Sequence, residues 1–290
     1  MDKLHREQWI DRFIDWAKLQ SDVRAIVLVG SNSRRDHPAD EWSDIDIILI
    51  ASTPKPYLDS IDWLASFGKL LFSIVERTAT GEAWVRRVLF ESGLDADFIV
   101  LSPLSVRQNF PGIPVIIEIL QRGRQVLMDK DGLFSSWPDE VSSRFVIRPP
   151  SPQEFMEVVN DFWFHTVWTA KKLRRGELWV ATTCNNGYMK RLLLQMMEWH
   201  AQATQESERD TWFDGRFIEQ WGSPQVVREL PKIIAHYDDE DVWRALMASM
   251  ELFQQIASKT AEHWQYIYPV IQVEKAIEWV TECYLEKASV

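Results

Sequence analysis

Residues 28–50, LVGSNSRRDHPADEWSDIDIILI, decide the fold of this chain, because two apolar runs flank a polar excursion. The first run ends at Gly30-Ser31, and the second begins with the letters SDIDIILI. On a strand the side chains of residues i and i+2 point to the same face, so Asp44 and Asp46 would emerge side by side while the isoleucines point into the core. The stretch therefore predicts two buried strands, with an acidic pair at the start of the second.

Two carboxylates this close repel each other unless a cation lies between them. Two carboxylates together with a substrate phosphate are a usual way for a protein to hold Mg²⁺. The alternative is an edge strand whose acids simply face water. The flanking letters IDIILIAS are too apolar for a strand with one face fully in water, so they favour the metal site.

Two further features support this interpretation. The segment LDADFIVLS is another apolar strand, and it carries Asp97. On a neighbouring strand, Asp97 would complete a three-carboxylate cluster suited to two metal ions about 3.5–4 Å apart. Upstream, Gly30 lets the backbone approach a ligand, and the Ser31 hydroxyl with backbone amides can hold a phosphate, although a lone Gly-Ser is also typical of an ordinary turn. A Gly-Ser pair followed by a strand Asp-x-Asp and a later strand aspartate is a much more specific signal than the Gly-Ser pair or the acids alone.

The rest of the chain divides into a mixed half and a helical half. Before residue 148, apolar patterns predict a helix, four strands and a second helix, over residues 4–18, 23–29, 44–51, 84–91, 96–102 and 115–122. The letters RPPSP at residues 148–152 break regular structure. After them, three- and four-residue spacing predicts helices over 153–175, 187–203, 240–258 and 272–287. We expect one domain over residues 1–147 and a second over 148–290.

Composition bounds the function. The 290 residues include 32 Lys and Arg and 43 Asp and Glu, which gives a formal net charge of −11. The chain therefore offers no basic track for binding a nucleic acid. Its negative charge is better suited to a cationic small-molecule substrate. Two cysteines are too few for a disulfide framework, and the histidines lack zinc-ligand spacing. The N-terminus is charged, and no run of about eighteen apolar residues occurs. We expect a cytoplasmic protein with no membrane partner.

The pattern of Gly-Ser, strand Asp-x-Asp and a third strand carboxylate resembles the nucleotidyltransferase superfamily related to DNA polymerase β. The segments DEWSDIDIILI, LQRGRQVLMDKDG, TAKKLRRGELWVA and MKRLLLQMMEWH resemble the aminoglycoside 6-adenylyltransferases, the streptomycin-modifying branch, and together they span nearly the whole chain. The resemblance implies an α+β protein in which a polymerase-β-like mixed-sheet catalytic domain precedes a C-terminal helical bundle that binds the acceptor. It also implies the transfer of AMP from ATP to a hydroxyl of an aminoglycoside, with streptomycin as the expected acceptor and antibiotic resistance as the result.

The resemblance assigns roles to the acids. Asp44 and Asp46 would bind the Mg²⁺ ions that carry ATP, and Asp97 would bind metal or help to activate the attacking hydroxyl. Gly30 and Ser31 would hold the β and γ phosphates.

Two residues of the helical half extend the predicted site. Lys171 is a candidate for a further phosphate contact, although a helical lysine is by default a solvated side chain. Glu177 is a candidate for binding a guanidinium or amine, and its alternative is an ordinary surface pair with a base such as Arg174 or Arg175.

Two other functions remain open on the sequence. One keeps the fold and changes the acceptor to another small molecule or a protein. The other is a catalytically silent nucleotide-binding module, against which the presence of Gly30, Ser31 and all three acids argues. Release of pyrophosphate in the presence of Mg²⁺ separates an enzyme from such a module.

Overall fold

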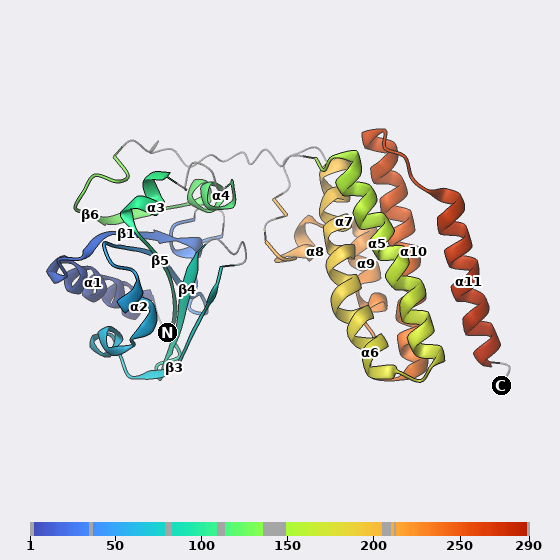
Figure 1. The fold of residues 1–290 in the computed structure, drawn as a ribbon, viewed down its shortest axis with the longest axis horizontal. Helices are drawn as coiled ribbons and strands as arrows, with labels where there is room; N and C mark the ends of the chain where they lie inside the picture. Colours follow the sequence, from blue (N-terminus) through green and yellow to red (C-terminus); the bar gives the residue numbers. More distant parts are fainter. Residues whose placement is uncertain are drawn as a thin grey trace. The chain divides into compact units, whose positions relative to one another are not determined.

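The computed structural model describes residues 3–34, 37–78, 83–108, 114–135, 149–204, 210–211 and 213–288. The chain forms two compact units, Met1–Ser143 and Arg144–Val290 (Figure 1). The domain boundary expected at residue 148 falls at the end of the stretch 136–148, which lies outside the described residues. Each unit is therefore described by itself.

The first unit is built on a six-stranded sheet with the order β3-β4-β5-β2-β1-β6. Only β2 and β5 are paired parallel, and the other neighbours are antiparallel. The strands are β1 (Val23–Val29), β2 (Ile45–Ala51), β3 (Leu70–Arg77), β4 (Trp84–Phe90), β5 (Asp95–Leu101) and β6 (Gln125–Asp129). The mixed sheet predicted from the sequence is confirmed, with β2 beginning one residue later than expected.

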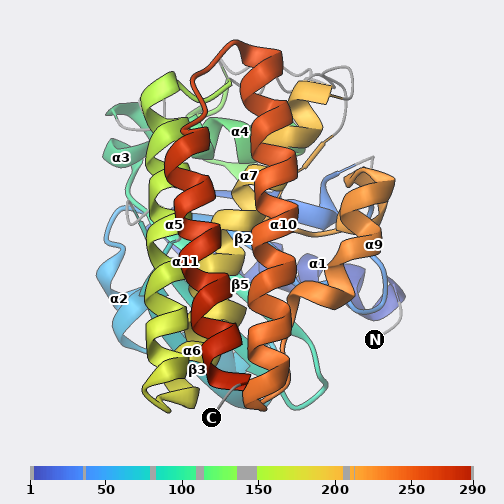
Figure 2. The same cartoon turned by 90° about the vertical axis from the view of Figure 1, so that its right-hand side faces the viewer.

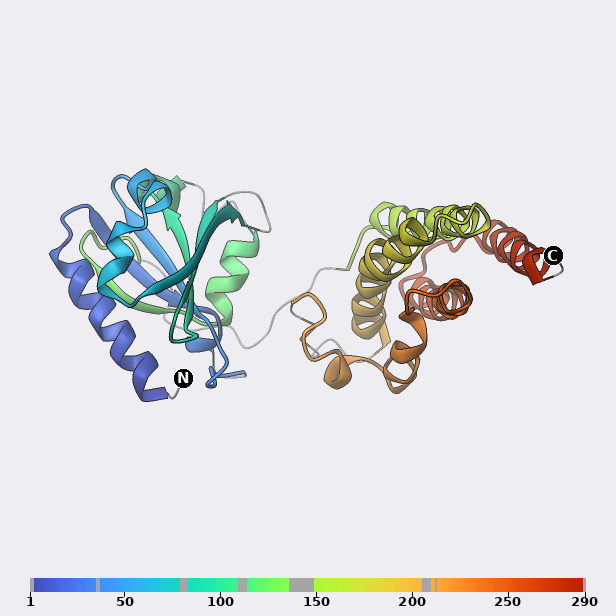
Figure 3. The same ribbon diagram turned by 90° about the horizontal axis from the view of Figure 1, so that it is seen from below.

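Helices cover both faces of the sheet, because the central strands are apolar on both sides. On β2, Ile47 belongs to a core that includes Phe13 of α1 (Lys3–Leu19), whereas Ile48 belongs to a second core that includes Leu120 of α4 (Pro114–Arg122). Figure 3 shows α1 and α4 on opposite sides of the sheet. The shorter helices of this unit are α2 (Lys55–Asp59) and α3 (Pro103–Gln108). Strands buried on both faces explain the continuous apolar runs of the sequence.

The strand β3 was not predicted, and its environment explains why. It is an edge strand that remains largely exposed on both faces, with Ile74 55% accessible on one face and Val75 38% on the other. Its pairing with β4 is stabilised by Arg86, which is buried and donates hydrogen bonds to Ser73 Oγ and to the carbonyl oxygens of Tyr57 and Leu58. An exposed edge strand lacks the alternation that marks a half-buried one.

The second unit is helical, as expected. Four long helices, α5 (Pro152–Arg174), α7 (Met189–Thr204), α10 (Asp239–Trp264) and α11 (Val270–Ala288), run beside one another in Figure 2. Ser151 and Glu154 form a capping box at the start of α5, and Phe162 stacks on Phe253 of α10 with a centroid distance of 3.7 Å. Together with the mixed sheet, this bundle confirms the α+β fold class.

Three short helices and a π-helical turn of the second unit were not predicted. They are α6 (Leu178–Thr183), the π-helical turn Cys184–Tyr188, α8 (Ile218–Trp221) and α9 (Pro224–Ile233). Among the described residues, no helix is long and apolar enough to cross a membrane.

Candidate active site

The three acids predicted to form a cluster do come together. In the parallel pair of β2 and β5, Asp46 lies directly opposite Asp97, and Asp44 immediately precedes β2. One carboxylate oxygen from each of the three residues lies within 4.8 Å of the others. Because each side chain is only partly exposed, the three negative charges share a small volume with limited access to water.

A tight turn packs against this cluster. Gly30 begins a 3₁₀ turn, Gly30–Asn32, and has a φ of +66°. A Cβ atom at this position would lie 2.0 Å from Asp46 Oδ2, so only glycine allows the turn to approach the carboxylate. Asn32 donates a hydrogen bond of 2.6 Å from Nδ2 to the carbonyl oxygen of Asp44, which ties the turn to the start of β2.

The hydroxyl of Ser31 is the second notable feature of this turn. Its oxygen is buried and has no hydrogen-bond partner among the described residues. Unsatisfied buried hydroxyls are uncommon and call for an explanation such as a ligand. Ser31 therefore fits the phosphate-binding role predicted from the sequence.

Burial dominates the electrostatics of Asp97. It raises the pKa of this carboxyl to about 6, with Arg87 acting in the opposite direction and the charge of Asp44 adding to the rise. Arg87 Nη1 lies 3.3 Å from Asp97 Oδ2, and Arg87 Nε lies 2.7 Å from Glu76 Oε1. Burial also raises the pKa of Asp95, again with a contribution from Asp44. Burial and the neighbouring carboxylate of Asp44 therefore both disfavour the ionised forms of Asp95 and Asp97.

The donor set suits a hard divalent cation. Mg²⁺ prefers oxygen ligands, and a pair of metal ions is commonly bridged by carboxylates a few ångströms apart. Asp44, Asp46 and Asp97 offer oxygen ligands within 4.8 Å of one another, and the turn that carries the unpartnered hydroxyl of Ser31 packs against Asp46 at Gly30. The residues present thus fit a metal-bound phosphate compound.

Comparison with known proteins agrees with this arrangement. The model of the streptomycin adenylyltransferase family matches residues 4–283, nearly the whole chain. The chain belongs to the streptomycin adenylyltransferase family. It is therefore an enzyme, a nucleotidyltransferase.

Curated relatives align with most of the length of this member of the streptomycin adenylyltransferase family. An aminoglycoside 6-adenylyltransferase of Bacillus subtilis is 23% identical over 269 residues, covering 91% of this chain and 92% of the relative. One of Staphylococcus aureus is 22% identical, covering 91% and 93%. The crystal structure of an aminoglycoside 6-adenyltransferase from Bacillus subtilis aligns over 95% of this chain and 97% of its own, with 22% identity and a TM-score of 0.46.

The residues that the sequence places on the helical half of this family member lie on α5 and just beyond it. Lys171 Nζ is 5.4 Å from the centroid of the Trp279 ring of α11. The Glu177 carboxylate pairs with Lys172, at 2.8 Å, and with Arg175, and these two partners lower the pKa of Glu177. That arrangement matches the alternative interpretation of Glu177 as a surface ion pair, so its role as a substrate contact stays a prediction.

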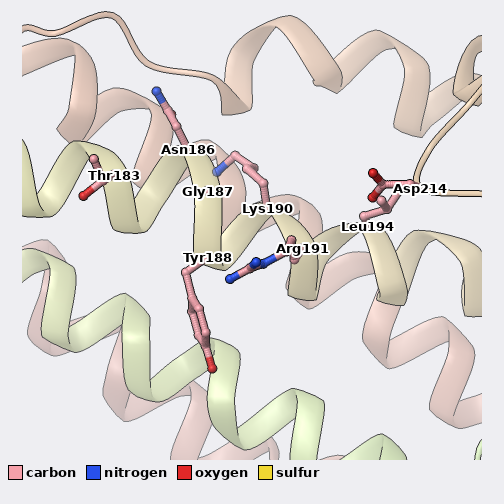
Figure 4. Close-up of a pocket in the computed structure, with 8 residues that line it drawn as sticks. All are labelled: Thr183, Asn186, Gly187, Tyr188, Lys190, Arg191, Leu194 and Asp214. Carbon is pink, nitrogen blue, oxygen red and sulfur yellow. The ribbon is translucent and has the colours of Figure 1, made fainter. Parts of the chain in front are cut away.

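The helical unit also contains a pocket that the sequence did not reveal. It has a volume of about 590 Å³ and opens at the π-helical turn Cys184–Tyr188, where π-helical geometry often marks a functional position. Figure 4 shows Tyr188 pointing toward α5 and Arg191 lying between Tyr188 and Lys190, with Asp214 on the far side. Lys190 Nζ donates to the carbonyl oxygen and Oδ1 of Asn185 and to Ser249 Oγ.

Sequence reasoning also missed Arg87, Glu76 and Asn32. The letters RR in WVRRVLF indicate one arginine on each face of a strand, which could have marked Arg87 as a neighbour of Asp97. The contact with Glu76 depends on the register of an unpredicted strand, and no sequence pattern indicates it.

Proposed function

We propose that this enzyme transfers AMP from ATP to a hydroxyl of an aminoglycoside in a Mg²⁺-dependent reaction. We propose streptomycin as the acceptor and resistance to it as the biological result. One observation carries the proposal: three carboxylates from β2, β5 and the residue before β2 converge against a glycine turn. The family match and the names of the relatives support adenylyl transfer and the aminoglycoside class of the acceptor.

The reaction is an in-line displacement at the α-phosphorus. The oxygen of the acceptor hydroxyl forms a bond to phosphorus, the bond to the β-phosphate oxygen breaks, and pyrophosphate leaves. Asp44 and Asp46 would hold the metal ions together with Asp97. When bound, these ions neutralise charge on the triphosphate, which is the main source of catalysis in such transfers.

Asp97 and Ser31 have distinct roles in this proposal. Asp97 accepts the proton of the attacking hydroxyl, and burial favours this role because it raises the pKa of the carboxyl to about 6, closer to neutral pH than an ordinary aspartate. Ser31 donates its hydroxyl proton to a phosphate oxygen, which satisfies a buried group that otherwise has no partner among the described residues. The amides of the Gly30 turn add further donors.

Lys171 and Glu177 complete the proposal on the helical unit. Lys171 would contact a phosphate, and Glu177 would bind a guanidinium or amine of the acceptor. Glu177→Gln should raise KM for the aminoglycoside with little change in KM for ATP, and Lys171→Met should do the reverse. Unchanged KM values in both variants would assign these side chains to the Trp279 contact and the surface ion pairs alone.

The direct test of the activity is product analysis. Purified protein is incubated with ATP, Mg²⁺ and a panel of aminoglycosides, and product masses are measured. The proposal predicts an aminoglycoside carrying one additional AMP, and stoichiometric pyrophosphate. Pyrophosphate release only with some other acceptor would support a different nucleotidyltransferase, and no release with any acceptor would support a silent nucleotide-binding module.

The identity of the acceptor is tested in cells. Bacteria that express the protein should resist streptomycin while remaining sensitive to kanamycin and gentamicin, because in-line attack places one hydroxyl within about 3–3.5 Å of phosphorus and other scaffolds misplace theirs. Cells with Asp97→Asn serve as the control and should be sensitive to all three drugs. Streptomycin sensitivity despite soluble expression of the wild-type protein would contradict this assignment.

A further inference from the structure

A row of side chains crosses the sheet at the acidic cluster. The register pairs Asp46 with Asp97, Asp97 with Arg87, and Arg87 with Ile74, on the strands β2, β5, β4 and β3 in that order. Residues directly opposite one another share a face of the sheet, so Arg87 is the next side chain in line beyond the cluster. Any change at Arg87 therefore acts on Asp97 at contact distance.

The guanidinium of Arg87 bridges two carboxylates from its two neighbouring strands. Its Nη1 lies 3.3 Å from Asp97 Oδ2, and its Nε lies 2.7 Å from Glu76 Oε1. Glu76 lies two residues beyond Ile74 on β3, so its side chain emerges on the same face. The bridge thus has one end in the acidic cluster and one end outside it.

The two ends of this bridge differ in exposure. The side chain of Asp97 is 15% accessible, whereas those of Arg87 and Glu76 are 51% and 46% accessible. A half-exposed ion pair contributes little net free energy, so the guanidinium can shift from one carboxylate to the other at small cost. A divalent cation bound beside Asp97 would repel the Arg87 guanidinium at contact distance, so it would disfavour the contact with Asp97 more than the contact with Glu76.

From this geometry we infer that Arg87 is an exchangeable counter-ion of the acidic cluster, which bridges Asp97 and Glu76 in the absence of a divalent cation and pairs with Glu76 alone when the cation binds. Glu76 is the alternative partner that keeps the guanidinium close without blocking the cluster. Arg87 is accordingly a positioning residue. This inference rests on the proposed metal site.

The exchange makes specific predictions for Mn²⁺ affinity. Arg87→Gln removes the competing cation and should tighten Mn²⁺ binding by about two- to fivefold, the range that a half-exposed ion pair supports. Glu76→Gln removes the alternative partner and should weaken Mn²⁺ binding by about the same factor. Arg87→Lys keeps the charge but loses the fork that spans two carboxylates, so its affinity should lie between those of the wild type and Arg87→Gln.

A double-mutant cycle separates exchange from the simple effect of charge. If Glu76 acts only through its field, Glu76→Gln weakens Mn²⁺ binding equally with or without Arg87. If it acts through exchange, its effect should fall to less than about 1.5-fold in the Arg87→Gln background. Glu91 is a matched control, because it is 48% accessible and pairs with Lys69 rather than with Arg87. Glu91→Gln should leave the affinity unchanged.

Mn²⁺ binding to the nucleotide-free protein is measured from the paramagnetic resonance signal of the free ion. A Mn²⁺ site is assigned to the acidic cluster only if it is present in the wild type and absent from Asp46→Asn. Thermal unfolding verifies that each variant is folded. Additive effects of Arg87→Gln and Glu76→Gln, or no effect of either, in a protein whose wild type binds Mn²⁺ would overturn the exchange and leave the proposed function intact. A wild type with no Mn²⁺ site sensitive to Asp46→Asn would overturn the proposed metal site and the exchange together.

Discussion

Two of the places in this molecule where charge is shielded from water hold that charge in opposite ways. In the helical unit, Lys190 Nζ is surrounded by three neutral acceptors at 2.8–3.2 Å, one for each of its protons, and no carboxylate of the described residues pairs with it. In the sheet unit, Asp44, Asp46 and Asp97 gather like charges within 4.8 Å. The first arrangement is satisfied by neutral acceptors, whereas the second gathers carboxylates around a space suited to a cation, with Arg87 as a counter-ion at its edge.

The comparison teaches how a structural charge differs from a functional one. Lys190 supplies the donors for the carbonyl of Asn185, a group in the π-helical turn, and so completes the fold of that turn. The three aspartates bring charges of one sign together, and their mutual repulsion opposes folding without metal. A buried charge whose hydrogen bonds are complete is a part of the architecture. Clustered charges of one sign point to a ligand.

The largest expected effect concerns the acids. Asp44→Asn and Asp46→Asn should each lower the rate of adenylyl transfer by at least about a thousandfold, because each removes a metal ligand. Without metal, each variant should be as stable as the wild type or slightly more stable, since one repelling charge is gone. Steady-state rates and thermal unfolding check both expectations. Asp59→Asn, an exposed acid on α2, is the control and should change neither quantity.

A second prediction concerns the pH dependence introduced by Lys190. Burial lowers the pKa of Lys190 to about 7, from about 10.5 for a solvated lysine. Between pH 7 and 10 the unfolded chain therefore binds more protons than the folded chain, so the free energy of unfolding should rise with pH, by about 2 kcal/mol after allowance for relaxation. Lys190→Met should remove this rise in denaturant unfolding curves, while Mn²⁺ binding at the acidic cluster stays unchanged. A loss of Mn²⁺ binding would show that the two charged regions are coupled.

The smallest effect concerns Glu198, a second acid that burial affects. Burial, with a contribution from the charge of Asp214, raises the pKa of Glu198 to about 7, from about 4.5 for a solvated glutamate. Between pH 4.5 and 7 the folded chain binds more protons, so the free energy of unfolding should fall as pH rises through this window. Glu198→Gln should be more stable than the wild type by about 1–2 kcal/mol at pH 8 and equal to it at pH 4.

The control for Glu198 is Glu262→Gln, which replaces an exposed acid of α10. It should leave the pH dependence of unfolding unchanged. If Glu198→Gln and Glu262→Gln gave the same unfolding curves at both pH values, Glu198 would be an ordinary solvated acid. The acidic cluster at β2 and β5 would then differ from Glu198 in being affected by burial and by neighbouring negative charge.

Much of the fold can be predicted from the sequence, because buried positions in helices and strands are apolar at regular spacing. The strand β1 has the predicted bounds Val23–Val29, and the gap between the strands predicted over 84–91 and 96–102 contains Gly93, in a left-handed conformation with φ +80°. The edge strand β3 was missed because exposure on both faces leaves no alternation. The π-helical turn Cys184–Tyr188 was missed because its letters CNNGY carry no sustained apolar three- and four-residue spacing.

The candidate site, like the fold, could be predicted only in part from the sequence. Asp44, Asp46 and Asp97 could be proposed because strand acids in apolar runs are unusual, and their meeting followed from the expected pairing of two strands. The close approach of Gly30 to Asp46, by contrast, depends on atomic packing. The bridge from Asp97 to Glu76 through Arg87 depends on the register of three strands, which a single sequence does not reveal.

The most direct test of the central claim is the location of the metal. Crystals grown with Mn²⁺ and a non-hydrolysable ATP analogue would be measured at a wavelength where manganese scatters anomalously. The account predicts anomalous peaks in contact with Asp44, Asp46 and Asp97, with the phosphates against the Gly30 turn. Bound nucleotide whose Mn²⁺ touches none of these three carboxylates would contradict it.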